Sequence, residues 1–185
     1  MILFEKRGPQ NTEETCKIAI AKAMELDTDL VSPTVEGTSA ITLCEMAKAA
    51  GFQNKIVIVS HAYGTREPGA NKLSEENRRV LENYGARVVT TTHVLSGAER
   101  GLSEVFHGIY PVEIMAHTLR MFGAGVKVAV EIAVMALDAG AVSYGKKIVC
   151  LGGTSRGVDT AAVLTPAHAN RILQTRIHEL LCKPE

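Results

Sequence analysis

Two glycine-bearing segments of the sequence carry residue types that bind phosphate groups in proteins. The first is residues 32–40, Ser-Pro-Thr-Val-Glu-Gly-Thr-Ser-Ala, in which Gly37 stands directly before Thr38 and Ser39. If this segment leaves a strand and begins a helix, the free backbone N–H groups and the dipole of the helix N-terminus favour an anion. The hydroxyls of Thr34, Thr38 and Ser39 add donors. The alternative interpretation is a common strand–helix turn with a hydroxyl cap. The Gly-Lys-Ser/Thr ending of a Walker loop is missing.

The second segment is residues 152–160, Gly-Gly-Thr-Ser-Arg-Gly-Val-Asp-Thr. Its three glycines indicate tight turns or the close approach of a ligand to the backbone. A purely structural turn remains an equal alternative. The segment is only loosely similar to a dinucleotide fingerprint and no strand–helix–strand unit follows it, so we reject a nicotinamide site. The candidates for ligand contact here are Gly152, Gly153, Thr154, Asp159 and Thr160.

The elements that position these segments follow from the alternation of short β-branched runs with helical patterns. The pattern predicts an α/β fold: a three-layer α/β/α sandwich with a mostly parallel sheet, in a single domain over residues 1–185. Strands are expected at 2–5, 29–32, 56–60, 87–92 and 147–151, and helices at 12–26, 38–50, 74–84, from Pro111 and at 126–137. In the tail, residues 161–164 suggest an edge strand, and residues 176–182 fit a strand or a helix.

Both glycine-bearing segments leave predicted strands, and ligands of open parallel sheets lie outside the carboxyl ends of the strands. A helix that precedes a parallel strand begins at the same edge, so Asn11, the expected N-cap of the first helix, and Thr12 belong to the predicted rim. His61 and His93 follow strands and belong to it as well. A single loop histidine is more often solvated structure than a ligand contact. The rim is therefore a candidate binding surface.

The remaining ionisable residues are weaker candidates for ligand binding or catalysis. Lys127, Glu131 and Asp138 form one stripe on the apolar helix at 126–137 and are interpreted as a solvated or interface face. The sharper hypothesis places Lys127 beside the ligand, because it lies near a helix start. We expect no metal site and find no nucleophile elbow. The other histidines are interpreted as surface or structural residues: His107, His117, His168 and His178.

Composition restricts the class of protein. The chain has 185 residues and a net charge of +0, with no basic stripe, so a nucleic-acid partner has no electrostatic support. The apolar run at 126–141 is interrupted by charged residues, so no membrane span is expected. The four cysteines are scattered, which argues against zinc. Cys16, Cys44 and Cys150 lie in apolar surroundings and are interpreted as small core residues. Free thiols fit a reducing compartment, and we expect a cytoplasmic protein.

At these motifs the chain resembles stand-alone proteins similar to the pyruvate kinase C-terminal α/β domain. The resemblance spans nearly the whole sequence and rests on residues 8–12, 35–40, 92–97, 118–122, 125–128 with Glu131, 135–136, 152–154 with Gly157, and 159–161. The usual family run is closer to Ser-Thr-Ser-Gly-x-Thr-Ala. In this chain the corresponding run contains Pro33, and the acidic Glu36 lies beside the loop. Glu36 would repel a phosphate dianion if its side chain pointed inward.

The resemblance implies a regulatory or binding role. The corresponding loop of pyruvate kinases holds a phosphate of a sugar-phosphate effector, and stand-alone members look like binders of flavin mononucleotide (FMN). The leading hypothesis is therefore a binding or sensing domain for a phosphorylated small molecule, most likely FMN. The alternatives are a flavin-dependent enzyme of unknown substrate and an oligomeric interaction module with a vestigial phosphate loop. Since these 185 residues contain no catalytic barrel, we expect no pyruvate kinase activity from them. A homo-oligomer is expected, because the apolar helix at 126–137 needs cover on both flanks.

Overall fold

The computed structural model describes residues 1–154 and 156–185. In these residues seven strands form one sheet in the order β1-β7-β6-β5-β2-β3-β4. The central strands β5, β2, β3 and β4 are parallel, β1 is parallel to β7, and β6 is antiparallel to β5 and β7. The predicted α/β class with a mostly parallel sheet is confirmed. The strands are β1 Ile2–Phe4, β2 Leu30–Thr34, β3 Ile56–Ser60, β4 Arg87–Thr90, β5 Ile148–Gly152, β6 Thr160–Thr165 and β7 Arg176–Pro184.

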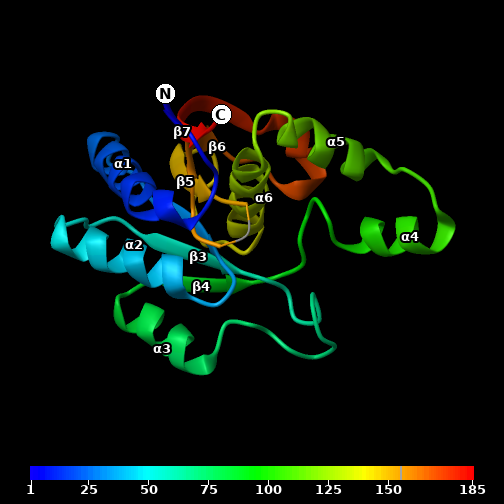
Figure 1. The fold of residues 1–185 in the computed structure, drawn as a ribbon, viewed down its shortest axis with the longest axis horizontal. Coiled ribbons are helices and arrows are strands. Elements are labelled where there is room, and N and C mark those ends of the chain that lie inside the picture. The colour runs from blue at the N-terminus through cyan, green and yellow to red at the C-terminus, as the bar shows by residue number, and fades with distance from the viewer. Residues whose placement is uncertain (155) are drawn as a thin grey trace.

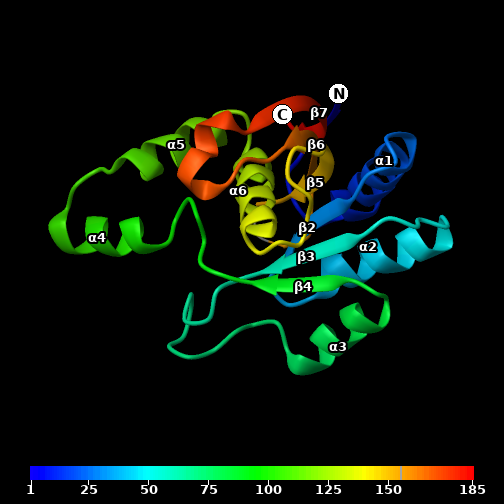
Figure 2. The same cartoon turned by 180° about the vertical axis from the view of Figure 1, so that it is seen from behind.

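Helices cover both faces of the sheet, which gives the expected three layers (Figures 1 and 2). The helices α1 (Thr12–Glu25), α2 (Thr38–Ala49) and α3 (Glu75–Asn83) pack on one face. On the other face lies α6 (Ala124–Asp138), with α5 (Pro111–Arg120) beside it. The helix α4 (Ala98–Phe106) buries none of its residues. Two 3-10 turns, η1 (Pro9–Asn11) and η2 (Ala169–Gln174), complete the elements.

The core follows the two-residue period of the strands. Leu30 and Ile58 point to the layer of α1, α2 and α3, whereas Val31 and Val57 point to α6. Because both faces of β3 and β5 are buried, these two strands are nearly continuous apolar runs. No helix among the described residues is long and apolar enough to cross a membrane.

The predicted position of the tail strand is wrong. The residues 161–164 belong to β6, which lies inside the sheet between β5 and β7 and not at its edge. Five of the six residues of β6 are buried, as both neighbours require. The ambiguous residues 176–182 form β7, and β7 supplies the partner that the sequence pattern did not identify. The sheet edges are β1 and β4.

The strand order creates a switch point between β2 and β5. From β2 the chain steps to β3 and β4 in one direction, and it then returns to place β5 on the other side of β2. Ligands of open α/β sheets bind at the carboxyl ends of the strands at such a point. Here Thr34 of β2 pairs with Ser60 of β3, which pairs with Thr90 of β4. Three hydroxyl residues therefore lie side by side along this edge of the sheet.

Candidate functional site

The first predicted loop has the geometry of an anion site at a helix N-terminus. Gly37 is the N-cap of α2 and has a φ of 111°, in the region that favours glycine. Its N–H donates to Thr34 Oγ1 at 3.0 Å, so buried Thr34 shapes the loop. The first backbone bond of the helix runs from Ile41 N–H to Gly37 O at 2.9 Å. The backbone N–H groups of residues 38–40 come before Ile41 in the helix and are therefore the free donors of a helix start.

Glu36 does not enter this loop. It is exposed, and its carboxylate Oε1 lies 3.9 Å from Lys72 Nζ on the loop before α3. Its backbone oxygen accepts a bond of 2.6 Å from Asn77 Nδ2 of α3. The carboxylate is therefore held at the surface beside a cation, which offsets the repulsion that it would exert on an anion.

The second predicted loop is held by internal bonds. Asp159 is 1% exposed, and its Oδ2 accepts bonds from Gly8 N–H at 3.1 Å and Thr154 Oγ1 at 3.2 Å. Its Oδ1 accepts a bond from Thr160 Oγ1 at 3.1 Å. These bonds tie the loop between β5 and β6 to the segment before α1. Ser155 of this loop lies outside the described residues.

Close backbone approach explains the glycines of the second loop. A Cβ atom on Gly152 would meet the carbonyl of Gly125 in the first turn of α6, and one on Gly153 would meet the carbonyl of Gly157. A Cβ atom on Gly157 would meet Thr12 Oγ1 at the start of α1. The glycines thus let the N-termini of α1 and α6 pack directly against the carboxyl end of β5.

Asn11 and Thr12 lie at this edge, as predicted, but they act differently from the expected cap. The Asn11 side chain makes no cap bond to α1, so that part of the interpretation is wrong. Asn11 already has helical φ and ψ at the end of η1, and its Nδ2 donates to Lys6 O at 2.7 Å. Thr12 Oγ1 accepts a bond of 3.2 Å from Val158 N–H and so joins α1 to the second loop.

The stripe on α6 is buried, so its interpretation as a solvated face is wrong for two of its three residues. Lys127 and Glu131 are 5% and 3% exposed, and Lys127 Nζ lies 2.5 Å from Glu131 Oε2. Glu131 Oε1 accepts bonds from Leu95 N–H at 2.9 Å and Ser96 Oγ at 3.2 Å. The carboxylate therefore fixes the loop after β4 to α6. Glu131 is the polar residue of this edge that the sequence did not select as a site residue.

His93 and His61 extend this buried group toward the phosphate loop. His93 Nδ1 lies 3.8 Å from Glu131 Oε2, and the two imidazole rings are 5.2 Å apart. Desolvation by burial lowers the pKa of both histidines below the usual value, more than Glu131 raises it. It also lowers the pKa of Lys127, against the opposing effect of Glu131. The lowered pKa favours the neutral form of both imidazoles.

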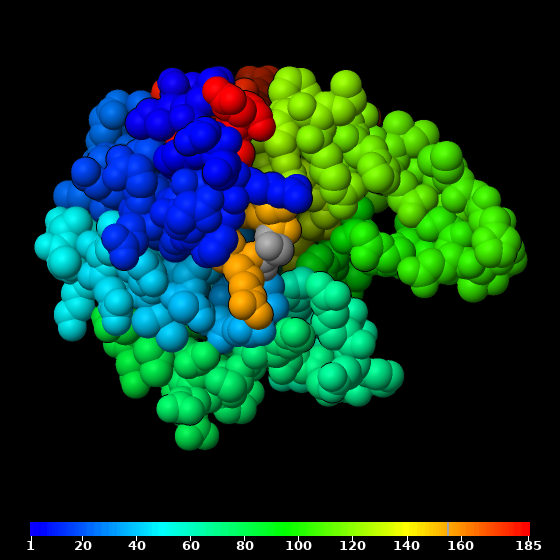
Figure 3. Space-filling view, in the orientation of Figure 1, coloured from blue at the N-terminus to red at the C-terminus, as the bar shows by residue number. Residues whose placement is uncertain are grey.

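All predicted site residues lie at one edge of the sheet, whereas two hollows of different size lie in two different places. A cavity of about 10 Å³, lined by Val35 and His61 among others, lies beside the phosphate loop and has room for hardly one water molecule. A hollow of about 680 Å³ lies at the other end of α6, near Asp138. An anion at a helix start needs no enclosed cavity, so the converging donors of the first loop can bind one without a large hollow beside them. Figure 3 shows this edge, where the segment near the N-terminus, the second loop and the 61–73 loop meet.

Comparison with known proteins places these features in a family. The model of the family described as "Pyruvate kinase, alpha/beta domain" matches residues 13–164. Among solved structures the chain is similar to O-ureido-L-serine synthase, with 17% sequence identity and a TM-score of 0.32. That match covers 72% of this chain and 49% of the synthase, so the chain spans about half the length of that protein.

Proposed function

Because the chain belongs to the pyruvate kinase α/β domain family, we propose that it is a binding or sensing domain for a phosphorylated small molecule, and that this molecule is FMN. The observation that carries the proposal is the start of α2. There Gly37 turns the chain with φ 111° and leaves the first amides of the helix as donors at the switch point of the sheet. The choice of FMN rests on the resemblance alone.

The phosphate group of the ligand would lie against Gly37, Thr38 and Ser39. The rest of the ligand would extend along the strand ends, toward Gly152, Gly153 and Thr154 or toward His61 and His93. Thr34, Asp159 and Thr160 would support the site through the internal bonds that they make. Lys127, on α6, would contribute a positive charge near the strand ends. The same side chain forms an ion pair with Glu131.

The variant Thr38→Val tests the proposal. It removes one hydroxyl donor and leaves the backbone unchanged. A charge-assisted hydrogen bond contributes about 1.5–3 kcal/mol, so the dissociation constant for FMN should rise roughly ten- to a hundredfold. Titration of FMN and riboflavin, followed by quenching of flavin fluorescence, measures the change. Affinity for riboflavin, which has no phosphate, should stay the same.

Two further variants sharpen this experiment. Thr42→Val, one turn further along α2, is the matched control and should leave FMN affinity unchanged. Gly37→Ala should weaken FMN binding, because φ is positive and a Cβ atom there would lie 2.9 Å from Asn77 Cβ. Equal affinity of the wild type for riboflavin and FMN would refute the phosphate site. Absence of binding to either flavin would favour an interaction module with a vestigial loop.

A flavin-dependent enzyme is the second candidate, and the buried group on α6 favours it. Lys127, Glu131 and His93 place a cation, a carboxylate and a neutral imidazole within one cluster beside the strand ends. Such groups can hold or move a proton near a bound ligand. Reduction of protein-bound FMN by a nicotinamide donor, faster than that of free FMN and lost in Glu131→Gln, would support the enzyme over the binding domain.

We also propose that the chain works as a homo-oligomer in the cytoplasm. Large apolar side chains are exposed along α4, α5 and the segments that flank them: Leu102, Val105, Phe106, Ile109, Ile114, Met121 and Phe122. Exposed apolar surface of this density is typical of protein interfaces. The four cysteines are free and buried, which fits a reducing compartment.

A further inference from the structure

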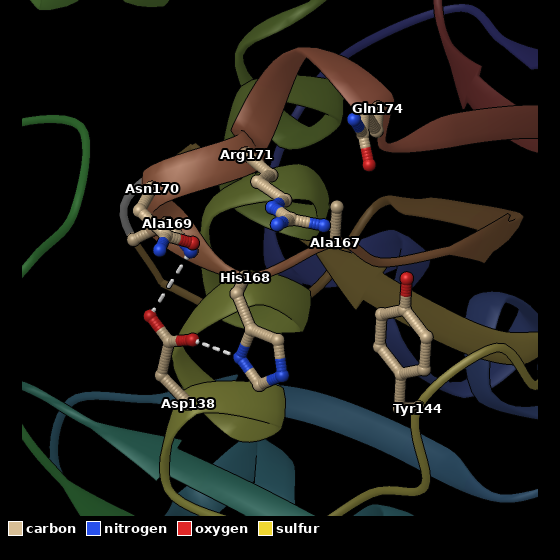
Figure 4. Close-up of a pocket in the computed structure, with 8 residues that line it drawn as sticks. All are labelled: Asp138, Tyr144, Ala167, His168, Ala169, Asn170, Arg171 and Gln174. Atoms are coloured by element: carbon tan, nitrogen blue, oxygen red, sulfur yellow. Dashed lines mark hydrogen bonds and ion pairs between the residues drawn. The ribbon is translucent and has the colours of Figure 1, made fainter.

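The far end of α6 carries a second group of polar side chains around a hollow. The hollow has a volume of about 680 Å³, within the usual range for small-molecule sites. It lies between the C-terminal end of α6, the turn that bears Tyr144 and the 3-10 turn η2 (Figure 4). Because α6 runs antiparallel to β5, this end of the helix is at the opposite edge of the sheet from the phosphate loop.

His168 is held in one orientation at this hollow. Its Nδ1 donates to Asp138 Oδ1 at 2.6 Å, and Ala169 N–H donates to Asp138 Oδ2 at 3.3 Å. Since a carboxylate only accepts, the proton of the neutral imidazole is on Nδ1, and Nε2 offers a lone pair. The ring of Tyr144 lies parallel to the imidazole, with the centroids 5.7 Å apart and the planes inclined by 7°. Asp138 thus holds the Nδ1 edge of the imidazole, and Tyr144 lies along one face of its ring.

Donors lie across the hollow from this imidazole. The guanidinium of Arg171 extends from η2 toward the space above His168, and the hydroxyl of Tyr144 and the amide of Gln174 border the same space (Figure 4). Among residues 1–154 and 156–185, no carboxylate lies within ion-pairing distance of Arg171. The two carboxylate oxygens of Asp138 accept bonds from His168 and from the Ala169 amide.

We propose that this hollow is a second small-molecule site, which binds a small anion that carries a hydroxyl group. A guanidinium is the side chain best suited to bind a carboxylate or a phosphate through two parallel bonds. The Nε2 lone pair of His168 accepts the hydroxyl proton of the same ligand. Tyr144 closes one side of the site. The site is independent of the phosphate loop, and the sequence did not identify it because its residues come from separate elements.

Amide signals of the 185-residue chain in two-dimensional NMR spectra provide the test, with lactate and glycerol phosphate as probes. Both anions should shift the signals of Ala167, His168, Ala169 and Asn170. Lactate should bind more tightly than propionate, which differs from it only by the missing hydroxyl. Arg171→Gln should weaken both anions roughly tenfold or more, because it removes a charge-assisted bond.

Two control variants separate this site from general charge effects. Arg79→Gln removes another exposed arginine, on α3, and should leave lactate affinity unchanged. His168→Phe keeps a ring beside Tyr144 but removes Nε2, so it should abolish the preference for lactate over propionate. The proposal is overturned if the anions shift no signal of residues 167–174. It is equally overturned if Arg171→Gln and Arg79→Gln weaken binding alike, or if glycerol phosphate shifts only residues 37–39.

Discussion

Lys127 and Glu131 form an ion pair in which the two side chains are only 6% and 4% exposed. Removal of one member of such a pair leaves a buried charge without its partner, which costs about 3–5 kcal/mol. We therefore expect Lys127→Met to lower the free energy of unfolding by about that amount. Urea denaturation of the purified protein measures this change. The double variant with Glu131→Gln should recover part of the loss.

The pair of Glu14 and Lys17 on α1 provides the control for this prediction. These side chains are 52% and 73% exposed and lie 3.9 Å apart, so solvent screens the pair. Lys17→Met should produce no measurable change in stability. A Lys127→Met variant as stable as Lys17→Met would show that the buried pair does not hold the loop after β4 to α6.

His61 and His93 predict a loss of stability in acid. Burial lowers the pKa of each imidazole in the folded state below the usual value of 6.5. As the pH falls below that value, the unfolded chain takes up protons before the folded chain does, so the free energy of unfolding decreases. Above that value both states are neutral and this contribution is fully present. Urea unfolding at about pH 7.5 and about pH 5.5 measures the difference.

The double variant His61→Gln, His93→Gln identifies the source of this pH dependence. It should show a smaller decrease over the same interval, since the exposed histidines are common to both proteins. An equal decrease in wild type and variant would assign the acid effect to other groups.

At the scale of elements, the close approach of α6 to β5 depends on two glycines. A Cβ atom on Gly152 would meet backbone atoms of Gly125. Since backbone atoms cannot move aside as a flexible side chain can, Gly152→Ala should destabilise the protein by about 1–3 kcal/mol. Thermal or urea unfolding checks this value. Gly125→Ala should behave similarly, because its Cβ atom would meet the side chain of Thr160.

Gly101 in α4 is the matched control for these glycines. A Cβ atom there would meet nothing within 4 Å. Gly101→Ala should therefore stabilise the helix by about 0.5–1 kcal/mol, the usual difference between alanine and glycine in a helix. A destabilising effect of Gly101→Ala would contradict the exposed position of α4.

The element α4 also shows where local sequence patterns fail. The sequence patterns assigned no element to residues 98–106, and Gly101 lowers the helix propensity of this segment. The predicted edge position of residues 161–164 was wrong for another reason. An inner strand and an edge strand have similar sequences when each is short and apolar, and only the pairing of β6 with β7 distinguishes them.

At the scale of the whole molecule, α4 and α5 predict self-association. Figure 3 shows these helices extending from the body of the molecule, and Phe106 and Ile109 are 68% and 80% exposed. The double variant Phe106→Asp, Ile109→Asp should lower the molar mass in solution toward that of one chain, 19.8 kDa. Size-exclusion chromatography with light scattering measures the mass. Met24→Asp, at a side chain 47% exposed on α1, should not change it. A wild type that is monomeric at high micromolar concentration would contradict the prediction.

Local sequence patterns were enough to predict the α/β class, most of the central strands and helices, and the glycine turn at Gly37 before α2. These are local properties: the period of apolar residues sets the element, and a glycine at a strand–helix junction marks the turn. The prediction that both glycine loops reach one edge also followed, because parallel strands end together.

The roles of the polar residues at that edge depend on contacts in the folded chain that the sequence patterns did not predict. Asp159 and Thr12 accept bonds from segments far away in sequence, so no local pattern could show that they hold loops together. The stripe of Lys127 and Glu131 is charged and therefore resembled a solvated face. It is buried because the loop after β4 covers it and supplies Leu95 N–H as a donor. The physical reason is the same in each case: burial and partner choice depend on contacts between distant segments, and these exist only in the folded chain.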